Sequence, residues 1–230
     1  MQGEVGKPVS YEELEAALSL ERFGRYLSWA GGDRERAIAL YTLNTAVSES
    51  LYTPLQMLEV ALRNRIHAVM TEARHEAWFR DGGMLLGQWQ PDQLAKAVSD
   101  IEEHRKEPTP GRIVAALTFS FWTSMFGKDY ENLWQTTLHR IARRADGKGL
   151  RRKDFSGPLA QIRELRNRTA HHEPVIMWNL PKRYASMLEM MEWLAPAAAA
   201  WCQANSRFEQ VYPAERIELQ QGARPDGQDG

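Results

Sequence analysis

The chain has 230 residues, of which 43% are hydrophobic and 26% are charged, a composition typical of a globular protein with a substantial core. Its 29 Lys and Arg residues balance 30 Asp and Glu residues, which argues against a protein that coats nucleic acid through bulk positive charge but leaves room for a local basic site. A single cysteine, Cys202, excludes an internal disulfide and a cysteine-based zinc finger, and it fits a reducing compartment. The N-terminal residues lack the apolar core of a signal peptide, and the longest apolar stretches are too short to span a bilayer. We therefore expect a cytoplasmic protein without membrane association.

The first half of the chain carries the three-to-four spacing of apolar residues that is typical of amphipathic helices. Ser10 and Glu13 form a capping box, and Asp33 is a second cap residue. Pro54 suits the first turn of a helix, where its missing N–H group is tolerated. The helices expected here span about residues 10–18, 20–30, 33–49 and 54–69.

The second half is also helical, and it shows neither strand alternation nor a hairpin signal. A mostly apolar segment at 113–126 predicts one buried helix, and Gly157-Pro158 predicts the start of a helix that Pro174 ends. The polar sequence beyond Pro213 predicts a disordered tail. We expect one all-α helical-bundle domain over residues 1–212, followed by a tail at 213–230. The remaining helices are expected at about 91–105, 130–144 and 181–205.

The stretch Arg166-Asn167-Arg168-Thr169-Ala170-His171 lies near the end of the helix that Pro174 closes. Arginine offers a planar, permanently charged fork for phosphate oxygens. Histidine is the side chain that transfers a proton near neutral pH. An arginine, an amide and an imidazole together are suited to a phosphodiester, so RNA cleavage is the first reaction that this stretch indicates.

The spacing within the stretch also permits a purely structural interpretation. Positions five apart lie roughly 140° apart around an ideal helix, so Arg166 and His171 converge only if the helix frays or tightens before Pro174. Otherwise Arg166 and Asn167 would be solvated surface residues, and His171 would simply favour the helix C-terminus. Two interpretations are likewise open for Glu59, Arg63 and His67, which form an i, i+4, i+8 row: a surface ion pair, or a buried pair that braces the motif helix.

The Arg-Asn-x-x-x-His motif on a late helix of an all-α chain resembles the signature of HEPN ribonuclease domains. Four further segments, in their order, resemble the Abi-like family (abortive infection, AbiD/AbiF type) of the HEPN superfamily, and the resemblance extends over about residues 18–205. The chain has Thr169 where the family often has cysteine, and it has no tyrosine two residues after His171, so control by nucleotidylation is not expected. The four segments are Arg22–Leu27, Tyr41–Asn44, Leu51–Asn64 and Leu117–Gly127.

The resemblance implies a HEPN-like fold and a metal-independent endoribonuclease that uses the 2′-OH of RNA as its nucleophile. His171 would act as base or acid, Arg166 would hold the scissile phosphate, and Asn167 would orient the phosphate or the imidazole. It also implies toxin-type phage defence, with an RNA or protein antitoxin as a possible partner. The residues given a supporting role are Glu59, Arg63, Asn64 and His172.

A single motif supplies one secure imidazole, whereas a base and an acid together conveniently use two. We therefore expect a homodimer that brings two motifs together in a composite site, as HEPN relatives commonly do. No cofactor is expected. Neither a His-Glu-x-x-His nor a His-x-x-x-His pattern occurs, so no metal site is expected either.

A basic loop before the motif helix either extends the surface that binds RNA or is an ordinary solvated loop. Two other functions stay open: a catalytically inactive HEPN-like module that binds RNA or a protein partner, and a purely structural dimer that buries the polar cluster. The residues expected to contact RNA are Arg143, Arg144, Lys148, Arg151, Arg152 and Lys153.

Overall fold

The computed structural model describes residues 11–18 and 20–220, and within these ranges the regular structure is entirely helical. The all-α prediction is therefore confirmed. Ser10 of the predicted capping box lies outside the described residues. The longer helices are α1 (Tyr11–Leu18), α2 (Leu20–Trp29), α3 (Arg34–Ser50), α4 (Tyr52–Ala73), α5 (Trp89–Glu103), α9 (Arg152–Ala170), α10 (Leu180–Leu194) and α11 (Pro196–Asn205). The shorter helices are α6 (Pro110–Ala116), α7 (Phe119–Ser124), α8 (Glu131–Thr136) and α12 (Phe208–Val211), with 3-10 turns at Trp78–Arg80, Lys128–Tyr130 and Leu138–Ile141.

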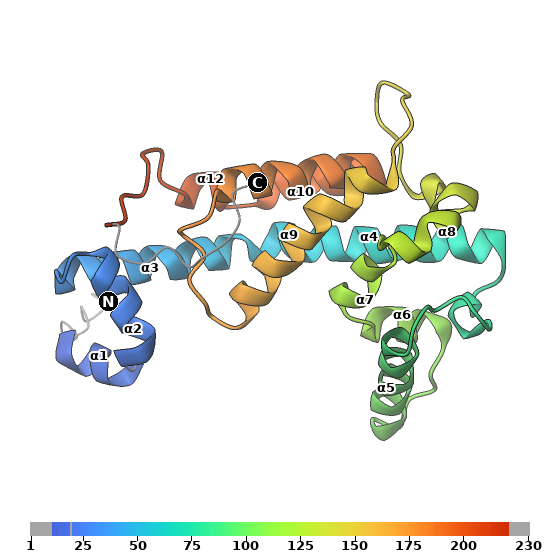
Figure 1. The fold of residues 1–230 in the computed structure, drawn as a ribbon, viewed down its shortest axis with the longest axis horizontal. Coiled ribbons are helices and arrows are strands. Elements are labelled where there is room, and N and C mark those ends of the chain that lie inside the picture. Colours follow the sequence, from blue (N-terminus) through green and yellow to red (C-terminus); the bar gives the residue numbers. More distant parts are fainter. Residues whose placement is uncertain (1–10, 19, 221–230) are drawn as a thin grey trace, which may run out of the picture.

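Helix α4 is the central element of the molecule. Figure 1 shows α3 and α4 following one another along the long axis, with α10 beside α4 and α9 crossing in front of it. The apolar residues of α4 are buried because α10, α11, α7 and the 3-10 turn at Leu138–Ile141 pack against it. The main hydrophobic core thus surrounds α4, and Leu58, Leu62 and Ile66 lie fully buried within it.

A second, smaller core lies where α2 packs against α3. Phe23, Tyr26 and Trp29 from α2 fill it, and Tyr26 and Trp29 meet edge to face with ring centroids 5.6 Å apart. Ile176, from the segment after α9, is buried in the same core. The N-terminal helices are therefore attached to the chain segment that directly follows the Arg-Asn-x-x-x-His motif.

Three predicted helices are interrupted, and the one expected at 130–144 is α8 followed, after Thr137, by the 3-10 turn at Leu138–Ile141. The segment at 113–126 is interrupted at Leu117 and Thr118, whose backbones are extended, and the Thr118 hydroxyl accepts the Phe121 N–H and caps α7. The segment at 181–205 is interrupted at Ala195, because the residue before a proline is driven out of helical geometry and Pro196 then begins α11. A local cap at Thr118 and a local proline effect at Ala195, neither of which is part of the apolar periodicity, account for these two interruptions.

The motif helix begins earlier than predicted, at Arg152 rather than at Gly157-Pro158. The Asp154 carboxylate accepts the Arg151 backbone N–H at 2.8 Å and so caps the first turn, and Pro158 lies inside the helix. The earlier start adds a turn and a half that joins α9 to the core through Phe155, which is fully buried.

Residues 213–220, which we expected in a disordered tail, run along the N-terminal helices. The Gln220 N–H donates to the Trp29 carbonyl at 3.0 Å, and Arg36 donates to the Glu218 carbonyl at 3.0 Å. Ile217 and Leu219 pack against the smaller core, which explains why this polar segment is held. Residues 221–230 lie outside the described part of the chain. Among the described helices, each falls short of the length or the hydrophobicity needed to cross a bilayer.

Candidate functional site

Helix α9 ends inside the motif. Arg166 and Asn167 are in its last turns, His171 is the residue that caps it, and His172 follows in a left-handed conformation at φ 56°. The His172 N–H donates to the Thr169 carbonyl and the Glu173 N–H to the Arg168 carbonyl, which is the Schellman arrangement of a helix C-terminus. The helix therefore stops before Pro174, and the imidazole of His171 is exposed on a residue that has left the regular spiral.

Glu59 of α4 lies against the motif helix. Its Oε2 is 4.0 Å from Nε of Arg166, with side chains 21% and 42% exposed respectively. Burial raises the pKa of the Glu59 carboxyl, and the nearby Arg166 and Arg63 partly offset that rise. The distance is long for a hydrogen bond, so Glu59 positions the guanidinium by charge while leaving its N–H groups available.

The other predicted supporting residues have different surroundings. Arg63 turns toward α6 and donates from Nη1 to the Ala115 carbonyl at 3.2 Å, and its buried Nε has no hydrogen-bond partner among the described residues. Asn64 is exposed on α4. His67 accepts the Trp78 indole N–H at 3.2 Å, and burial lowers the pKa of its imidazole. The row at 59, 63 and 67 thus braces three different elements instead of forming one surface ion pair.

Asn44, a buried residue of α3, holds the segment that follows the motif. Its Oδ1 accepts the backbone N–H of Val175 at 2.7 Å and that of Ile176 at 3.3 Å. Two buried backbone donors are satisfied by this one side chain. Asn44 lies in a sequence segment that carried the family resemblance, but its role could not be inferred there because its partners are more than 130 positions away.

Trp178 connects α9 to α10 on the other side of this segment. The guanidinium of Arg168 lies 4.8 Å from the centroid of the indole ring, and that of Arg183 lies 4.3 Å from it. Arg168 also pairs with Glu173 at 3.4 Å. The short chain between His171 and Leu180 is therefore fixed at Glu173, at 175–176 and at Trp178.

Arg22 is a further cation near the motif that the predicted site did not include. It is on α2, and its Nη2 lies 3.5 Å from the carbonyl oxygen of His171. The helices α2, α4 and α9 thus bring Arg22, Glu59 and Arg166 to the same end of the motif helix. The signal that could have found Arg22 is its place in the segment 22–27 that resembles the family.

Arg166 and His171 share this helix end, yet no hydrogen bond links their side chains within 11–18 and 20–220. Asn167 is exposed between them. The three predicted catalytic side chains are therefore accessible to solvent at the end of α9, and no hydrogen bond between them joins them into a closed polar network within the described residues. No cluster of three or more His, Cys, Asp or Glu side chains suited to a metal ion occurs in the described part of the chain.

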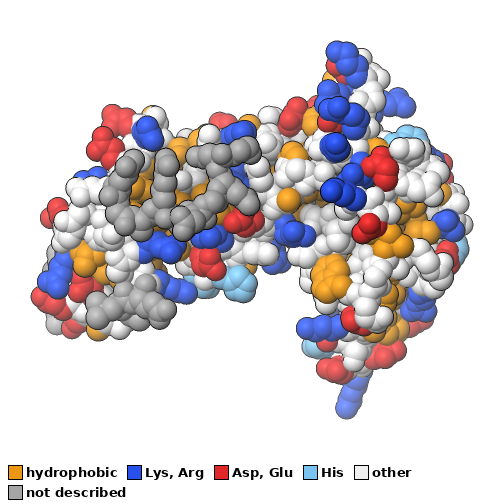
Figure 2. All heavy atoms as spheres, viewed as in Figure 1, with side chains coloured by type: hydrophobic (Ala, Val, Ile, Leu, Met, Phe, Trp, Pro, Cys, Tyr) orange, Lys and Arg blue, Asp and Glu red, His pale blue; other side chains and the backbone are white. Residues whose placement is uncertain are grey.

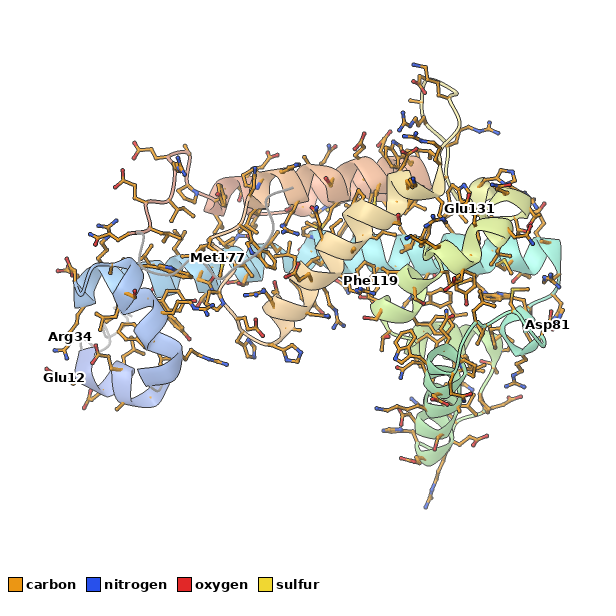
Figure 3. All side chains as sticks on the ribbon, in the orientation of Figure 1. Glu12, Arg34, Asp81, Phe119, Glu131 and Met177 are labelled. Carbon is orange, nitrogen blue, oxygen red and sulfur yellow. The ribbon has the colours of Figure 1, made fainter. Side chains whose placement is uncertain are left out.

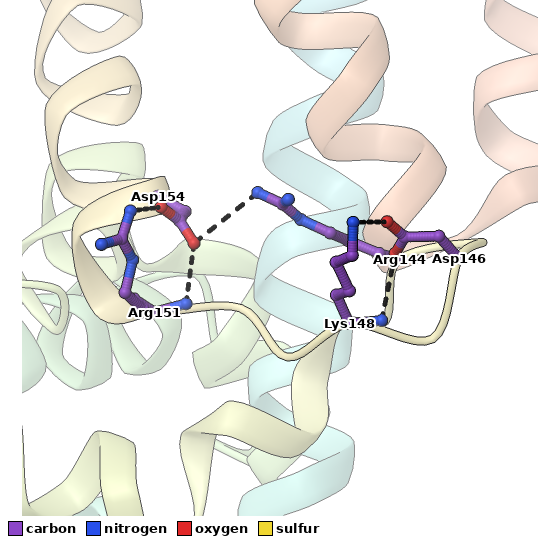
Figure 4. A network of polar contacts seen from close by, with 5 residues as sticks. All are labelled: Arg144, Asp146, Lys148, Arg151 and Asp154. Atoms are coloured by element: carbon purple, nitrogen blue, oxygen red, sulfur yellow. Dashed lines mark hydrogen bonds and ion pairs between the residues drawn. The ribbon is translucent and has the colours of Figure 1, made fainter.

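The predicted RNA-binding loop lies at the opposite end of α9, and its cations differ in their availability (Figure 4). Asp154 engages Arg151 at 3.1 Å and Arg144 at 3.7 Å, and Arg144 also lies over the Trp193 ring. Lys148 pairs with Asp146 at 3.4 Å, and Arg143 and Lys153 are exposed.

Arg152 is a correction to the predicted set of RNA contacts. Its side chain is only 8% exposed, and it donates to Glu131 Oε2 at 2.6 Å and to the Phe126 carbonyl at 2.5 Å. Figure 3 shows Glu131 on α8, near the beginning of α9. Arg152 therefore joins α9 to α8 and to the end of α7 from inside the fold. A buried guanidinium with these partners is unavailable to a ligand at the surface.

Comparison with known proteins agrees with the resemblance seen in the sequence. The profile of a family described as "Abi-like protein" matches residues 14–179, which is most of the chain and includes Asn44, Glu59 and the whole motif. No curated protein and no solved structure matches the chain. The matched region ends just before α10, so α10 and α11, which pack against α4, lie outside it.

Proposed function

The chain belongs to the Abi-like family, and from this we propose that it is a metal-independent endoribonuclease of the HEPN type that acts in abortive infection. One observation carries the proposal: α9 ends within the motif, so that Asn167 and His171 are exposed beside an Arg166 that Glu59 positions. Cleavage of a phosphodiester uses a group that binds phosphate and a group that transfers a proton, and here both types of side chain are accessible to solvent.

The reaction follows from the chemistry of RNA. His171 removes the proton of the 2′-OH, whose oxygen then forms a bond to phosphorus. The bond from phosphorus to the 5′-oxygen breaks, and an acid protonates the leaving oxygen. Arg166 stabilises the charge that develops on the phosphoryl oxygens, and Asn167 orients the phosphate or the imidazole. The products are a 2′,3′-cyclic phosphate and a 5′-hydroxyl.

A second imidazole would conveniently serve as the acid. Two copies of the chain related by a two-fold axis would supply it by placing two exposed helix ends in one composite cleft. His172 of the same chain is a local alternative. His171 and His172 are both exposed, but the backbone of His172 is held in the Schellman turn directly beside His171, so we propose that the second imidazole comes from His171 of a second copy.

The proposal is tested by incubating the purified protein with single-stranded RNA in EDTA and analysing the ends of the products. We expect cleavage that leaves 2′,3′-cyclic phosphates. Both Arg166→Ala and His171→Ala should abolish it, with a loss of roughly 100-fold or more, because removing one group that stabilises the transition state typically costs that much.

Matched controls are available in the same chain. Arg163→Ala removes a cation from the preceding turn of α9, and His104→Ala removes an exposed imidazole from the end of α5. Both should retain activity. Cleavage that survives Arg166→Ala or His171→Ala would disprove the proposal, and RNA binding without turnover by the wild type would instead identify a non-catalytic binding module.

A further inference from the structure

A basic pocket lies at the end of α9 that is farthest from the motif. It has a volume of about 520 Å³ and opens between the 3-10 turn at Leu138–Ile141, the loop before α9 and the end of α10. Figure 2 shows Lys and Arg side chains gathered over this loop, which projects from the body of the protein in Figure 1. The charged or titratable residues that line the pocket are Arg65, His139, Arg140, Arg143 and Lys148.

The pocket carries an excess of positive charge. In the described part of the chain, no carboxylate is among its lining residues. Glu72 pairs with Arg140 at 2.5 Å and Asp146 with Lys148 at 3.4 Å, both from outside the lining. Arg65 and Arg143 have no carboxylate partner among residues 11–18 and 20–220. Four permanent cations thus face two carboxylates, which leaves a site that favours an anion.

The walls of the pocket are built by the fold. Arg65 extends from the central helix α4 and donates from Nε to the Ile141 carbonyl at 3.0 Å and from Nη2 to the Arg140 carbonyl at 3.4 Å. The Arg143 N–H donates to the Trp193 carbonyl of α10 at 2.9 Å. Gly147 turns the loop back at φ 74°, a left-handed conformation that glycine adopts without strain. Arg65 and the backbones of Arg140 and Arg143 are therefore fixed by α4 and α10, whereas Lys148 lies on the loop itself with its side chain 77% exposed.

We propose that this pocket binds a backbone phosphate of the RNA substrate, at a distance from the scissile phosphate. The inference rests on the proposed function in taking RNA as the ligand. Fourteen residues of α9 separate Arg152 from Arg166, which is roughly 20 Å at about 1.5 Å per residue. An RNA strand held at both ends of α9 would span several nucleotides, so the protein would distinguish long RNA from short RNA by affinity.

The experiment measures RNA binding in a variant that cannot cleave. In the His171→Ala background, fluorescence anisotropy follows single-stranded RNA of about 20 and about 4 nucleotides at several salt concentrations. Adding Arg143→Ala with Lys148→Ala should weaken binding of the long RNA by about tenfold and reduce its salt slope by about 0.7 for each phosphate that the protein no longer neutralises. Binding of the short RNA should change little.

The proposal confines phosphate binding to the pocket and so replaces the wider set of RNA contacts expected from the sequence, which included Lys153. Lys153→Ala is therefore the control, because it removes an exposed cation beside the same loop that does not line the pocket. An effect of Lys153→Ala as large as that of the pocket variants would overturn the proposal, since it would indicate a diffuse basic surface. Displacement of the RNA by a mononucleotide or by inorganic phosphate at micromolar concentration would overturn it too, because the pocket would then be a site for a small ligand. Thermal unfolding confirms that each variant is folded.

The two proposals fail separately. A wild type that does not cleave RNA, but whose RNA affinity depends on Arg143 and Lys148, would refute the ribonuclease and keep the phosphate pocket. Cleavage by the wild type combined with unchanged affinity of the pocket variants would refute only the pocket.

Discussion

His172 adopts a left-handed backbone directly after the proposed catalytic imidazole of His171. For a residue with a side chain this conformation costs about 1–2 kcal/mol, and glycine is the usual occupant at this position of a Schellman turn. A strained residue at a functional site is often retained because the geometry is needed there. Here the turn ends α9 and separates His171 from the regular helix.

Replacing His172 with glycine should relieve this strain. We expect His172→Gly to raise the free energy of unfolding by about 0.5–1 kcal/mol, which is about 1–4 °C in Tm, after the greater entropy of unfolded glycine is allowed for. Denaturation followed by circular dichroism measures the change. RNA cleavage should persist if His171 is the imidazole that acts, and its loss in a well-folded His172→Gly protein would assign the second imidazole to His172.

Glu59 has a pKa raised by burial, and this has a defined consequence for stability. The carboxyl of Glu59 binds its proton more tightly in the folded protein than in the unfolded chain, so proton binding stabilises the folded state. This stabilisation is fully present below pH 4.5, and it is lost as the pH rises through the pKa that Glu59 has in the folded protein. Relative to Glu59→Gln, which does not titrate, the wild type should lose stability as the pH rises above 4.5 and through the raised pKa of Glu59.

Urea denaturation of the wild type and of Glu59→Gln across this range measures the difference. If the wild type instead gained stability relative to the variant as the pH rose, the ion pair with Arg166 would outweigh burial. The distance of 4.0 Å between the two side chains argues for a weak pair, which leaves Arg166 able to exchange Glu59 for a phosphate.

The elements around the motif are held by contacts between distant parts of the sequence. Helix α9 is fixed at its beginning by Arg152, along its length by buried Phe155 and Leu165, and beyond its end by Asn44 and Trp178. The contact with Asn44 joins positions more than 130 residues apart. The open face of the motif therefore depends on α3 and α10 as much as on α9 itself.

Asn44→Ala tests this dependence. The substitution leaves the buried N–H groups of Val175 and Ile176 without an acceptor, which should lower the free energy of unfolding by about 2–4 kcal/mol. Asn64→Ala is the matched control on the next helix, where the exposed side chain should change stability by less than about 0.5 kcal/mol. Chemical denaturation compares the two variants, and equal effects would refute the anchoring role of Asn44.

Taken as a whole, the chain presents one copy of the motif on an open surface. The proposed composite site therefore requires a second chain. Light scattering should give twice the 26.4 kDa mass of the chain at concentrations where RNA is cleaved, and cleavage per chain should fall on dilution as the dimer dissociates. A monomer with activity proportional to its concentration would contradict the composite site and would favour His172 as the second imidazole.

Sequence reasoning reached the helical class, most of the long helices and the position of the motif, because helix periodicity and cap residues are local signals. It misplaced the start of α9, because Gly157-Pro158 resembles a helix start whereas the Asp154 cap acts earlier. It assigned Arg152 to the surface because a run of basic residues carries no sign of which member is buried. The order of residues 213–220 depends on apolar contacts with α2 and α3 that no pattern within the segment predicts.

The sequence alone is enough to establish that the chain is all-α and Abi-like, and that Arg166, Asn167 and His171 lie near the end of a helix. These features can be recognised from the sequence because they depend on residues that are close together along the chain. The packing of the helices, in contrast, is what brings Glu59 to Arg166 and Arg22 to His171, and what gathers the cations of α4 and of the basic loop around one pocket. Charged side chains interact through space, so the partner of each one can come from any helix that packs around α4. The two partners are far apart in the sequence, and no local pattern predicts such a pairing.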